Sequence, residues 1–357
     1  MPDIGRNLRA LSSLTLEQRP NRDVVAEVSA LGTSERESFV KLANTHHVLI
    51  RALHSLEQGA LELRFVELEE WARASLAMEK IRVRSAVQAL ADICDALESA
   101  GCPTTVMKSL DHWPDVGRDF DLYTSADMQA VKNVLCGKFR AIVLPRSWGD
   151  CLANKCSFNL PGLDRTIEMH SGRLGQGGEH VELAARVERR RVSRAFEGCT
   201  FYVPAPEEQL MAATLQRMYR HMFFRICEFA NTARLIDCDC IDYRELIPAA
   251  KRAGVWHGVA TFLTIICDYV SGYRELAPQL PEQVRDAAGF GAEQFVVRGQ
   301  YLRVPLVPQA AGLFVRQFAG AALRGNVSAA VRLSLLPPLA SMAALAYKVT
   351  GSNQGIW

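Results

Sequence analysis

The sequence predicts an α+β fold in which a small mixed sheet lies between helical regions. Two observations support this. Apolar residues recur with the 3.6-residue period of helices before about residue 100 and after about residue 200. Between these regions, short apolar runs are separated by proline and glycine, which is typical of strands and turns. A chain of 357 residues is long enough for more than one core. We expect an N-terminal helical region (1–100), an α/β core (101–200), a helical domain packed on the core (201–275) and a C-terminal helical extension (276–357).

The N-terminal region is predicted to be mostly helical. Residues 1–20 are expected to be loosely ordered, whereas residues 21–60 carry helical patterns. Over residues 62–99, apolar residues such as Leu68 and Trp71 mark one face of a long helix or of a helix pair.

Two aspartates at the start of the core are the residues most suggestive of chemistry. Lys108 and Ser109 follow an apolar stretch that predicts a strand, and Asp119 and Asp121 begin a second strand-like run. Residues i and i+2 of a strand point to the same face, about 7 Å apart, so the two carboxylates should lie side by side. Paired carboxylates suit Mg²⁺, and two ions about 3.5–4 Å apart can stabilise both oxygens of a phosphoryl displacement. The alternative is a solvated aspartate pair on an edge strand.

This run resembles the nucleotidyltransferase superfamily of the polymerase-beta type, and within it the uncharacterised nucleotidyltransferase families of bacteria. Those families carry a lysine-containing turn, a Tyr-Pro-Asp-type turn, an arginine and then Asp-x-Asp-Leu. In this chain the matching places are taken by Lys108-Ser109, Trp113-Pro114-Asp115, Arg118 and Asp119-Phe120-Asp121-Leu122. The resemblance covers about residues 95–270. The chain departs from the pattern in having no glycine at 108 or 109, where close approach of the backbone to a triphosphate favours one.

The resemblance implies a third carboxylate on a later strand, and Glu168 is the candidate. Glu168 and His170 lie two residues apart in a strand-like run, so both should face the same way. The related families usually have aspartate at this place, followed two residues later by histidine. The resemblance implies that Asp119, Asp121 and Glu168 hold two Mg²⁺ ions, with Mn²⁺ as an alternative, and that Glu168 helps to deprotonate an acceptor hydroxyl. Otherwise Glu168 is an exposed strand carboxylate, and His170 only braces it.

Nucleotide binding is implied for residues on both sides of this motif. In the core, the resemblance implies that Lys108, Ser109 and Arg118 bind the phosphates of the nucleotide. A single helix is predicted over residues 207–236, on which Arg217, His221 and Arg225 lie four apart and form one stripe. The related families place an arginine and an acidic residue here. The corresponding assignments are Arg225 for nucleotide binding, with Arg217, His221, Glu228 and His170 as supporting residues. The alternative is a stripe of cations on an exposed helix without a function.

Five arginines between residues 179 and 197 form a basic run. A run of this kind is usually a solvated helix face, and its alternative is a contact for the acceptor or the phosphates. The apolar segments after residue 284 predict packing on the chain or a partner interface, with docking to a membrane surface as the alternative.

Composition narrows the class of protein without naming its function. The net charge of +2 does not by itself indicate a nucleic-acid partner. It also does not argue against a local basic groove that binds nucleic acid. The ten cysteines show no Cys-x-x-Cys spacing, so we expect reduced thiols in a cytoplasmic protein. The N-terminus lacks the apolar core of a signal peptide, and no stretch reaches the roughly 20 apolar residues of a transmembrane segment.

We therefore expect a Mg²⁺-dependent nucleotidyltransferase that moves a nucleoside monophosphate from an NTP, such as ATP, to a hydroxyl-bearing acceptor and releases pyrophosphate. The acceptor could be a small molecule, a peptide, a protein side chain or a tRNA end, and analogy favours a metabolite or peptide in natural-product biosynthesis. The alternative from another class is a catalytically inactive nucleotidyltransferase-like binding or scaffold protein. A third is an enzyme of this fold that uses the carboxylates as acid and base without an NTP.

Overall fold

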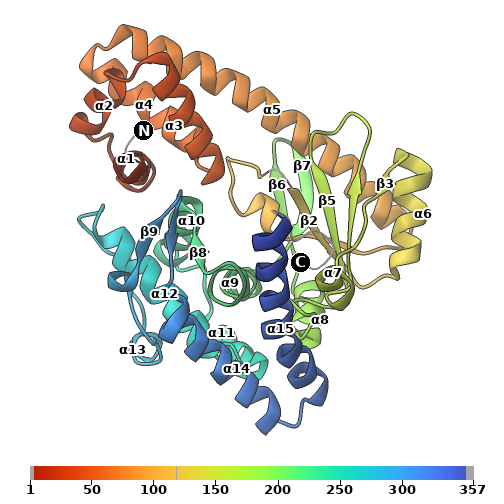
Figure 1. The fold of residues 1–357 in the computed structure, drawn as a ribbon. Coiled ribbons are helices and arrows are strands. Elements are labelled where there is room, and N and C mark those ends of the chain that lie inside the picture. The colour runs from red at the N-terminus through yellow and green to blue at the C-terminus, as the bar shows by residue number, and fades with distance from the viewer. Residues whose placement is uncertain (1–3, 118, 351–357) are drawn as a thin grey trace.

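The computed structural model describes residues 4–117 and 119–350. It confirms the mixed α+β class, with helices predominating over a small mixed sheet. The N-terminal helices form one group, and the last of them runs from that group to the sheet (Figure 1). They are α1 (Ile4–Leu16), α2 (Arg22–Ser29), α3 (Thr33–Thr45), α4 (Leu49–Leu63) and α5 (Val66–Ser99).

The main sheet has the strand order β1-β2-β5-β4-β3. Its strands are β1 (Thr104–Val106), β2 (Asp119–Thr124), β3 (Ile142–Val143), β4 (Lys155–Asn159) and β5 (Thr166–Ser171). The central strands β2 and β5 are parallel and their other neighbours are antiparallel, so the sheet is mixed. A short 3₁₀ turn, η1 (Lys108–Leu110), follows β1, while α6 (Met128–Phe139) and α7 (Trp148–Leu152) lie in later connections.

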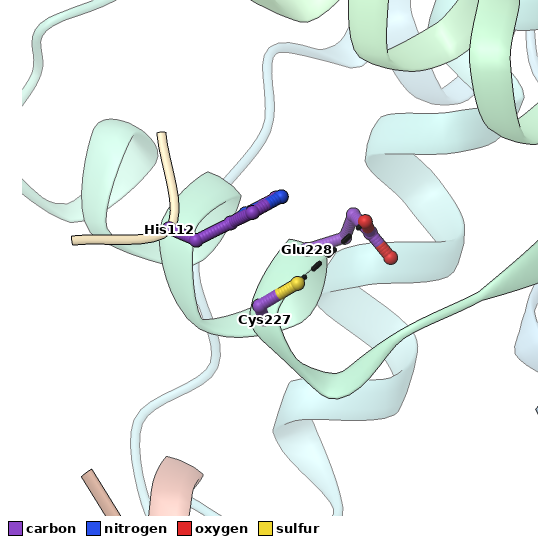
Figure 2. A group of neighbouring side chains, drawn as sticks. All are labelled: His112, Cys227 and Glu228. Atoms are coloured by element: carbon purple, nitrogen blue, oxygen red, sulfur yellow. Dashed lines mark hydrogen bonds between the residues drawn. The ribbon is translucent and has the colours of Figure 1, made fainter. Parts of the chain in front are cut away.

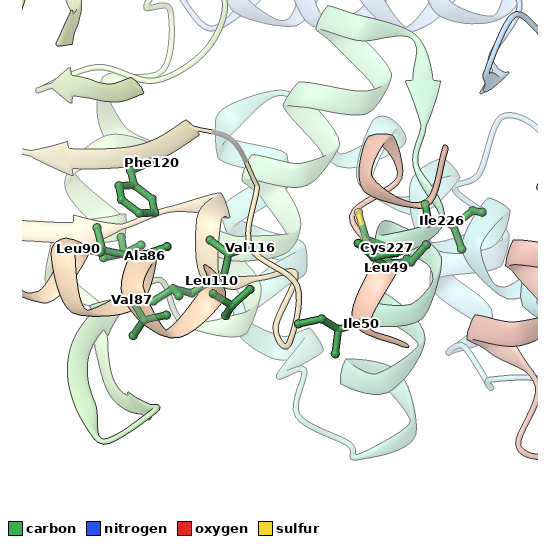
Figure 3. Packing of buried hydrophobic residues seen from close by; sticks show 14 of the residues in the cluster. Leu49, Ile50, Ala86, Val87, Leu90, Leu110, Val116, Phe120, Ile226 and Cys227 are labelled. Atoms are coloured by element: carbon green, nitrogen blue, oxygen red, sulfur yellow. The ribbon is translucent and has the colours of Figure 1, made fainter. Parts of the chain in front are cut away.

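One apolar core joins the sheet to the N-terminal helices. Phe120 of β2 is fully buried and lies over Ala86 and Leu90 of α5 (Figure 3). The same cluster continues through Leu110 to Ile50 of α4. Because alternate residues of β2 enter this core, the residues between them must face the other side of the sheet.

Most of the C-terminal half packs around a second core centred on α12 (Trp256–Ser271), whereas Phe201 and Val203 belong to the core that joins the sheet to the N-terminal helices. Phe224 stacks on Phe229 and Phe262 there, with ring centroids 5.4 Å apart in both pairs. The other elements of this half are α8 (Val181–Arg189), β6 (Val192–Phe196), β7 (Cys199–Val203), α9 (Pro206–Thr214), η2 (Leu215–His221), β8 (Phe223–Phe224), α10 (Ile226–Asp237), α11 (Tyr243–Ala253), α13 (Glu282–Arg285), η3 (Ala292–Gln294), β9 (Val296–Arg298), β10 (Tyr301–Arg303), η4 (Leu306–Ala310), α14 (Ala311–Leu323) and α15 (Val327–Thr350).

The single helix predicted over residues 207–236 is wrong. After α9 the chain forms the π-helical segment η2, turns at Met222 with a φ of 55°, and enters the short strand β8 before α10 begins. The reason is a long-range pairing: β8 joins β10 in an antiparallel ladder, and two consecutive phenylalanines suit a strand. The four-residue stripe is therefore not a feature of one regular helix.

Three further expectations need correction. The loosely ordered start predicted over residues 1–20 is wrong for α1, a helix whose Leu8 and Leu11 are buried, and residues 1–3 lie outside the described residues. The C-terminal extension also contains the β9–β10 hairpin, so it is not entirely helical. The cysteines are not all reduced, since Cys238 and Cys240 form a disulfide. No helix among the described residues is long and apolar enough to cross a membrane.

Candidate functional site

Strand register brings two predicted carboxylates together. In the parallel pairing of β2 with β5, Asp121 lies opposite Glu168. Asp119 lies two residues before Asp121, on the same face of β2, while Phe120 and Leu122 point into the core. The predicted shared face of Asp119 and Asp121 follows from this alternation, and Glu168 is added by the neighbouring strand.

The η1 turn fixes Lys108 and Ser109 against β2. The Ser109 hydroxyl donates to the carbonyl oxygen of Asp119 at 3.2 Å and accepts from the backbone N–H of Asp121 at 2.8 Å. The Lys108 ammonium lies 2.6 Å from the Asp121 carboxylate. Ser109 therefore holds the start of β2 in place, and Lys108 lies beside the carboxylates where a bound anion could also reach it.

A second ammonium lies on the other side of the carboxylate face. Lys155 of β4 is buried, and its Nζ atom is 2.6 Å from Glu168 and 3.8 Å from Asp150. Lys155 is not among the site residues predicted from the sequence. Its only available signal was the alternation of β4. That alternation places Lys155 near Glu168 only when β4 is known to pair with β5.

The carboxylate face offers a donor set that fits a divalent cation. Ligand atoms of Asp121, Glu168 and His170 all lie within 4.8 Å of one another. Carboxylate oxygens are the ligands that Mg²⁺ prefers. Asp119 lies outside this group, whereas His170, expected only as support, lies inside it. The group thus differs in one member from the predicted metal ligands Asp119, Asp121 and Glu168.

Charge and burial act differently on the two aspartates. Burial raises the pKa of the Asp119 carboxyl, and the nearby charges of Glu168 and Asp121 raise it further. Burial also pushes the pKa of Asp121 upward, but Lys108 and His170 outweigh that effect and hold it below its ordinary value. Burial lowers the pKa of His170, although its contact with Asp121 opposes the change. Near pH 7 the face therefore carries ionised Asp121 beside a neutral imidazole.

The carboxylate face opens into a cavity of about 400 Å³, and the part of its lining that comes from η2 and the start of α10 is rich in arginine. We call this part of the lining the arginine-rich side. The predicted residues Arg217, His221 and Arg225 all reach this cavity although their segment is not one helix. The lining consists of Asn44, Thr45, His47, Lys108, Ser109, His112, Gly117, Asp119, Asp121, Lys155, Glu168, Gln216, Arg217, Arg220, His221, Arg225 and Tyr301. Arg118 lies outside the described residues.

Residues from distant parts of the chain complete the arginine-rich side. The Arg225 guanidinium donates to His47 Nε2 at 2.7 Å, and His47 stacks on His112 with ring centroids 4.9 Å apart. Burial lowers the pKa of His47 and of His112 well below the ordinary value, and that of His221 to about 2, with arginine charges adding to the effect. Near pH 7 these imidazoles are neutral, so the positive charge comes from arginine and lysine.

Glu228 supports the arginine-rich side from behind and does not line the cavity. Its carboxylate lies 2.8 Å from Arg217 Nη2 and also accepts from the backbone N–H of Arg225 at the start of α10. Glu228, His112 and Cys227 form a second buried cluster whose ligand atoms lie within 4.8 Å of one another (Figure 2). Burial raises the pKa of the Cys227 thiol well above its ordinary value, and metal ligation requires the thiolate. The Cys227 thiol donates to Glu228 at 3.6 Å, and the Asn231 amide lies 3.2 Å from His112 Nδ1, so hydrogen bonds link this cluster to its surroundings.

Two arginines of the basic run between residues 179 and 197 form ion pairs that hold neighbouring helices together. Arg186 and Arg190 form ion pairs with Glu208 at 2.7 and 3.0 Å, and Arg190 also pairs with Glu207 at 2.7 Å. These contacts tie α8 to the first turn of α9. Arg186 is buried, so the expectation of a solvated face is wrong for it, whereas the Arg190 side chain is one-third exposed. Neither arginine lines the cavity described above.

Comparison with family models, curated proteins and solved structures finds no match for this chain. The resemblance to nucleotidyltransferases therefore depends on the motif residues and on what their arrangement can do.

Proposed function

We propose that this protein is a Mg²⁺-dependent nucleotidyltransferase that transfers a nucleoside monophosphate from an NTP to a hydroxyl and releases pyrophosphate. The observation that carries the proposal is one cavity lined both by the carboxylates of β2 and β5 and by the arginines of η2 and the start of α10. Asp121 and Glu168 would hold the metal ion, with Asp119 and His170 beside them. Lys108 and the arginines suit the negative charge of a triphosphate.

The proposed reaction is a displacement at the α-phosphorus. The acceptor oxygen attacks, the bond from the α-phosphorus to the bridging oxygen breaks, and pyrophosphate leaves with the bonding electrons. The acceptor proton passes to a carboxylate, and Glu168 is the residue that the family resemblance assigns to this step. When bound, Mg²⁺ supplies neutralisation of the charge on the phosphoryl oxygens.

A second candidate function is a nucleotide-binding protein without catalysis. The observation in its favour is that both ligand carboxylates already have ammonium partners, since Lys108 pairs with Asp121 and Lys155 with Glu168 at 2.6 Å. A resident ammonium can neutralise a carboxylate that an active enzyme would give to its metal ion. In that case an NTP would bind, but its α-phosphorus would not be attacked.

The test is to incubate the protein with α-labelled ATP, GTP, CTP or UTP, Mg²⁺ and acceptors of each hydroxyl class. We expect pyrophosphate release and label transfer with the parent, and neither with Asp121→Asn. Asp127→Asn is the matched control, because Asp127 caps α6 and asparagine caps a helix equally well. Binding of NTP without transfer to any acceptor class would support the second candidate and contradict the first.

A further inference from the structure

Three arginines form one side of the cavity, and we call Arg217, Arg220 and Arg225 the arginine wall. The Arg217 side chain is 1% exposed, and its Nε and Nη1 atoms have no hydrogen-bond partner among the described residues. The Nε atoms of Arg220 and Arg225 are likewise buried without a partner. A buried donor that lacks an acceptor costs roughly 1–3 kcal/mol, and more when the group is charged. Such a cost indicates that an acceptor is supplied from outside the chain.

The arginine wall carries more positive charge than its neighbours neutralise. Glu228 pairs with Arg217, but in the described part of the chain no carboxylate forms an ion pair with the side chain of Arg220 or Arg225. The contact that the Arg225 guanidinium makes with His47 does not neutralise it, because that imidazole is buried among cations and uncharged. An anionic ligand with several acceptor oxygens fits this surplus better than a single carboxylate does.

The C-terminal extension fixes the geometry of the arginine wall. The ring centroid of Phe223 in β8 lies 5.2 Å from the guanidinium carbon of Arg217 and 6.0 Å from the guanidinium carbon of Arg225. Tyr301 of β10 lines the cavity and stacks on Phe223 with ring centroids 4.1 Å apart. Since β10 pairs with β8, the β9–β10 hairpin holds the aromatic pair against which the guanidinium groups lie.

We propose that the arginine wall is a binding site for a polyphosphate anion that acts without a metal ion. A chain of two or three phosphoryl groups offers enough acceptor oxygens for the unpaired donors and enough charge for the unneutralised guanidinium groups. The inference rests on the proposed function for its natural ligand, the triphosphate of an NTP. The anion site itself is independent of transfer and of the carboxylate face.

The experiment is calorimetric titration of the full chain in EDTA with inorganic tripolyphosphate, and separately with orthophosphate. The first variant is Arg220→Gln, because Arg220 lacks a carboxylate partner and its loss leaves Glu228 paired. The second variant is Arg220→Lys, which keeps the charge and loses the planar fork. Arg84→Gln is the matched control, because Arg84 is an arginine of α5 whose side chain is 68% exposed.

We expect the parent and Arg84→Gln to bind tripolyphosphate equally, and more tightly than orthophosphate. Arg220→Gln should weaken binding by about tenfold or more, as expected for a charge-assisted contact, and Arg220→Lys by less. An NTP in EDTA should compete with tripolyphosphate. Absence of tripolyphosphate binding by the parent, equal affinity of Arg220→Gln and Arg84→Gln, or simultaneous binding of NTP and tripolyphosphate would overturn the inference. Tripolyphosphate binding by a chain that transfers no nucleotide would reject the proposed function and leave the anion site standing.

Discussion

Acidification should weaken the fold through one histidine that joins three parts of the chain. His46 follows α3 and is fully buried. Its Nε2 atom lies 2.7 Å from the carbonyl oxygen of Gln300, and its Nδ1 accepts from the backbone N–H of Ile226 at 3.1 Å. Only the neutral ring can donate at one nitrogen and accept at the other. Burial lowers the pKa of His46 to about 4, and the charges of Arg225 and Arg217 act in the same direction.

The size of the effect follows from the gap between the folded and unfolded pKa values. In the unfolded chain His46 takes up a proton below about pH 6.5, whereas in the folded chain it stays neutral down to about pH 4. Its contribution to the free energy of unfolding is therefore complete above pH 6.5 and lost as the pH falls from there toward 4. At about 1.36 kcal/mol per pH unit, the loss is about 2 kcal/mol by pH 5.

The assay is guanidinium chloride denaturation near pH 7.5 and near pH 5, applied to the parent and to His46→Gln. Glutamine has no titrating group, so the parent should lose about 2 kcal/mol more than the variant between the two conditions. Other buried groups titrate in both proteins, and the difference removes their contribution. An equal loss in both proteins would refute the description of His46 as a neutral link between α3, α10 and the β9–β10 hairpin.

Three further outcomes concern the carboxylate face. Glu168→Gln should lower the transfer rate at saturating Mg²⁺ far more than Glu168→Asp, because only aspartate keeps charge and basicity; equal rates for Glu168→Gln and the parent would remove Glu168 from the reaction. Lys108→Ala should raise KM for NTP by about tenfold or more, as measured by steady-state pyrophosphate release, and an unchanged KM would show that the triphosphate does not touch Lys108. Ser109→Ala should lower the free energy of unfolding by about 1–2 kcal/mol in urea denaturation, since it leaves the Asp121 N–H without its acceptor; a parental midpoint would contradict this.

The parts of the site that sequence could predict are those fixed by local periodicity. The alternation of β2 turns Asp119 and Asp121 to one face, and this holds for any strand that begins there. Glu168 and His170 follow by the same rule within β5. The long helix α5 was also predictable, because its apolar face repeats over many turns.

The arginine-rich side could not be derived in the same way, because its arrangement depends on contacts far apart in sequence. Arg217 and Arg225 reach the cavity on either side of a break in the helix, and the break exists because Phe223 and Phe224 pair with Leu302 and Arg303. No local pattern near residue 220 shows this pairing. The position of His47 in the cavity also depends on a contact between distant parts of the chain. His47 lies between α3 and α4 and accepts a hydrogen bond from Arg225 at the start of α10.

The central claim is that Asp121 and Glu168 hold the metal ion with which an NTP binds. It is tested most directly by calorimetric titration of a non-hydrolysable NTP into the parent and into Asp121→Asn, each with Mg²⁺ and with EDTA. We expect Mg²⁺ to tighten binding to the parent by about tenfold or more and to have little effect on the variant, whose affinity in EDTA should be close to that of the parent. An equal effect of Mg²⁺ on both proteins, or no effect on the parent, would contradict the claim.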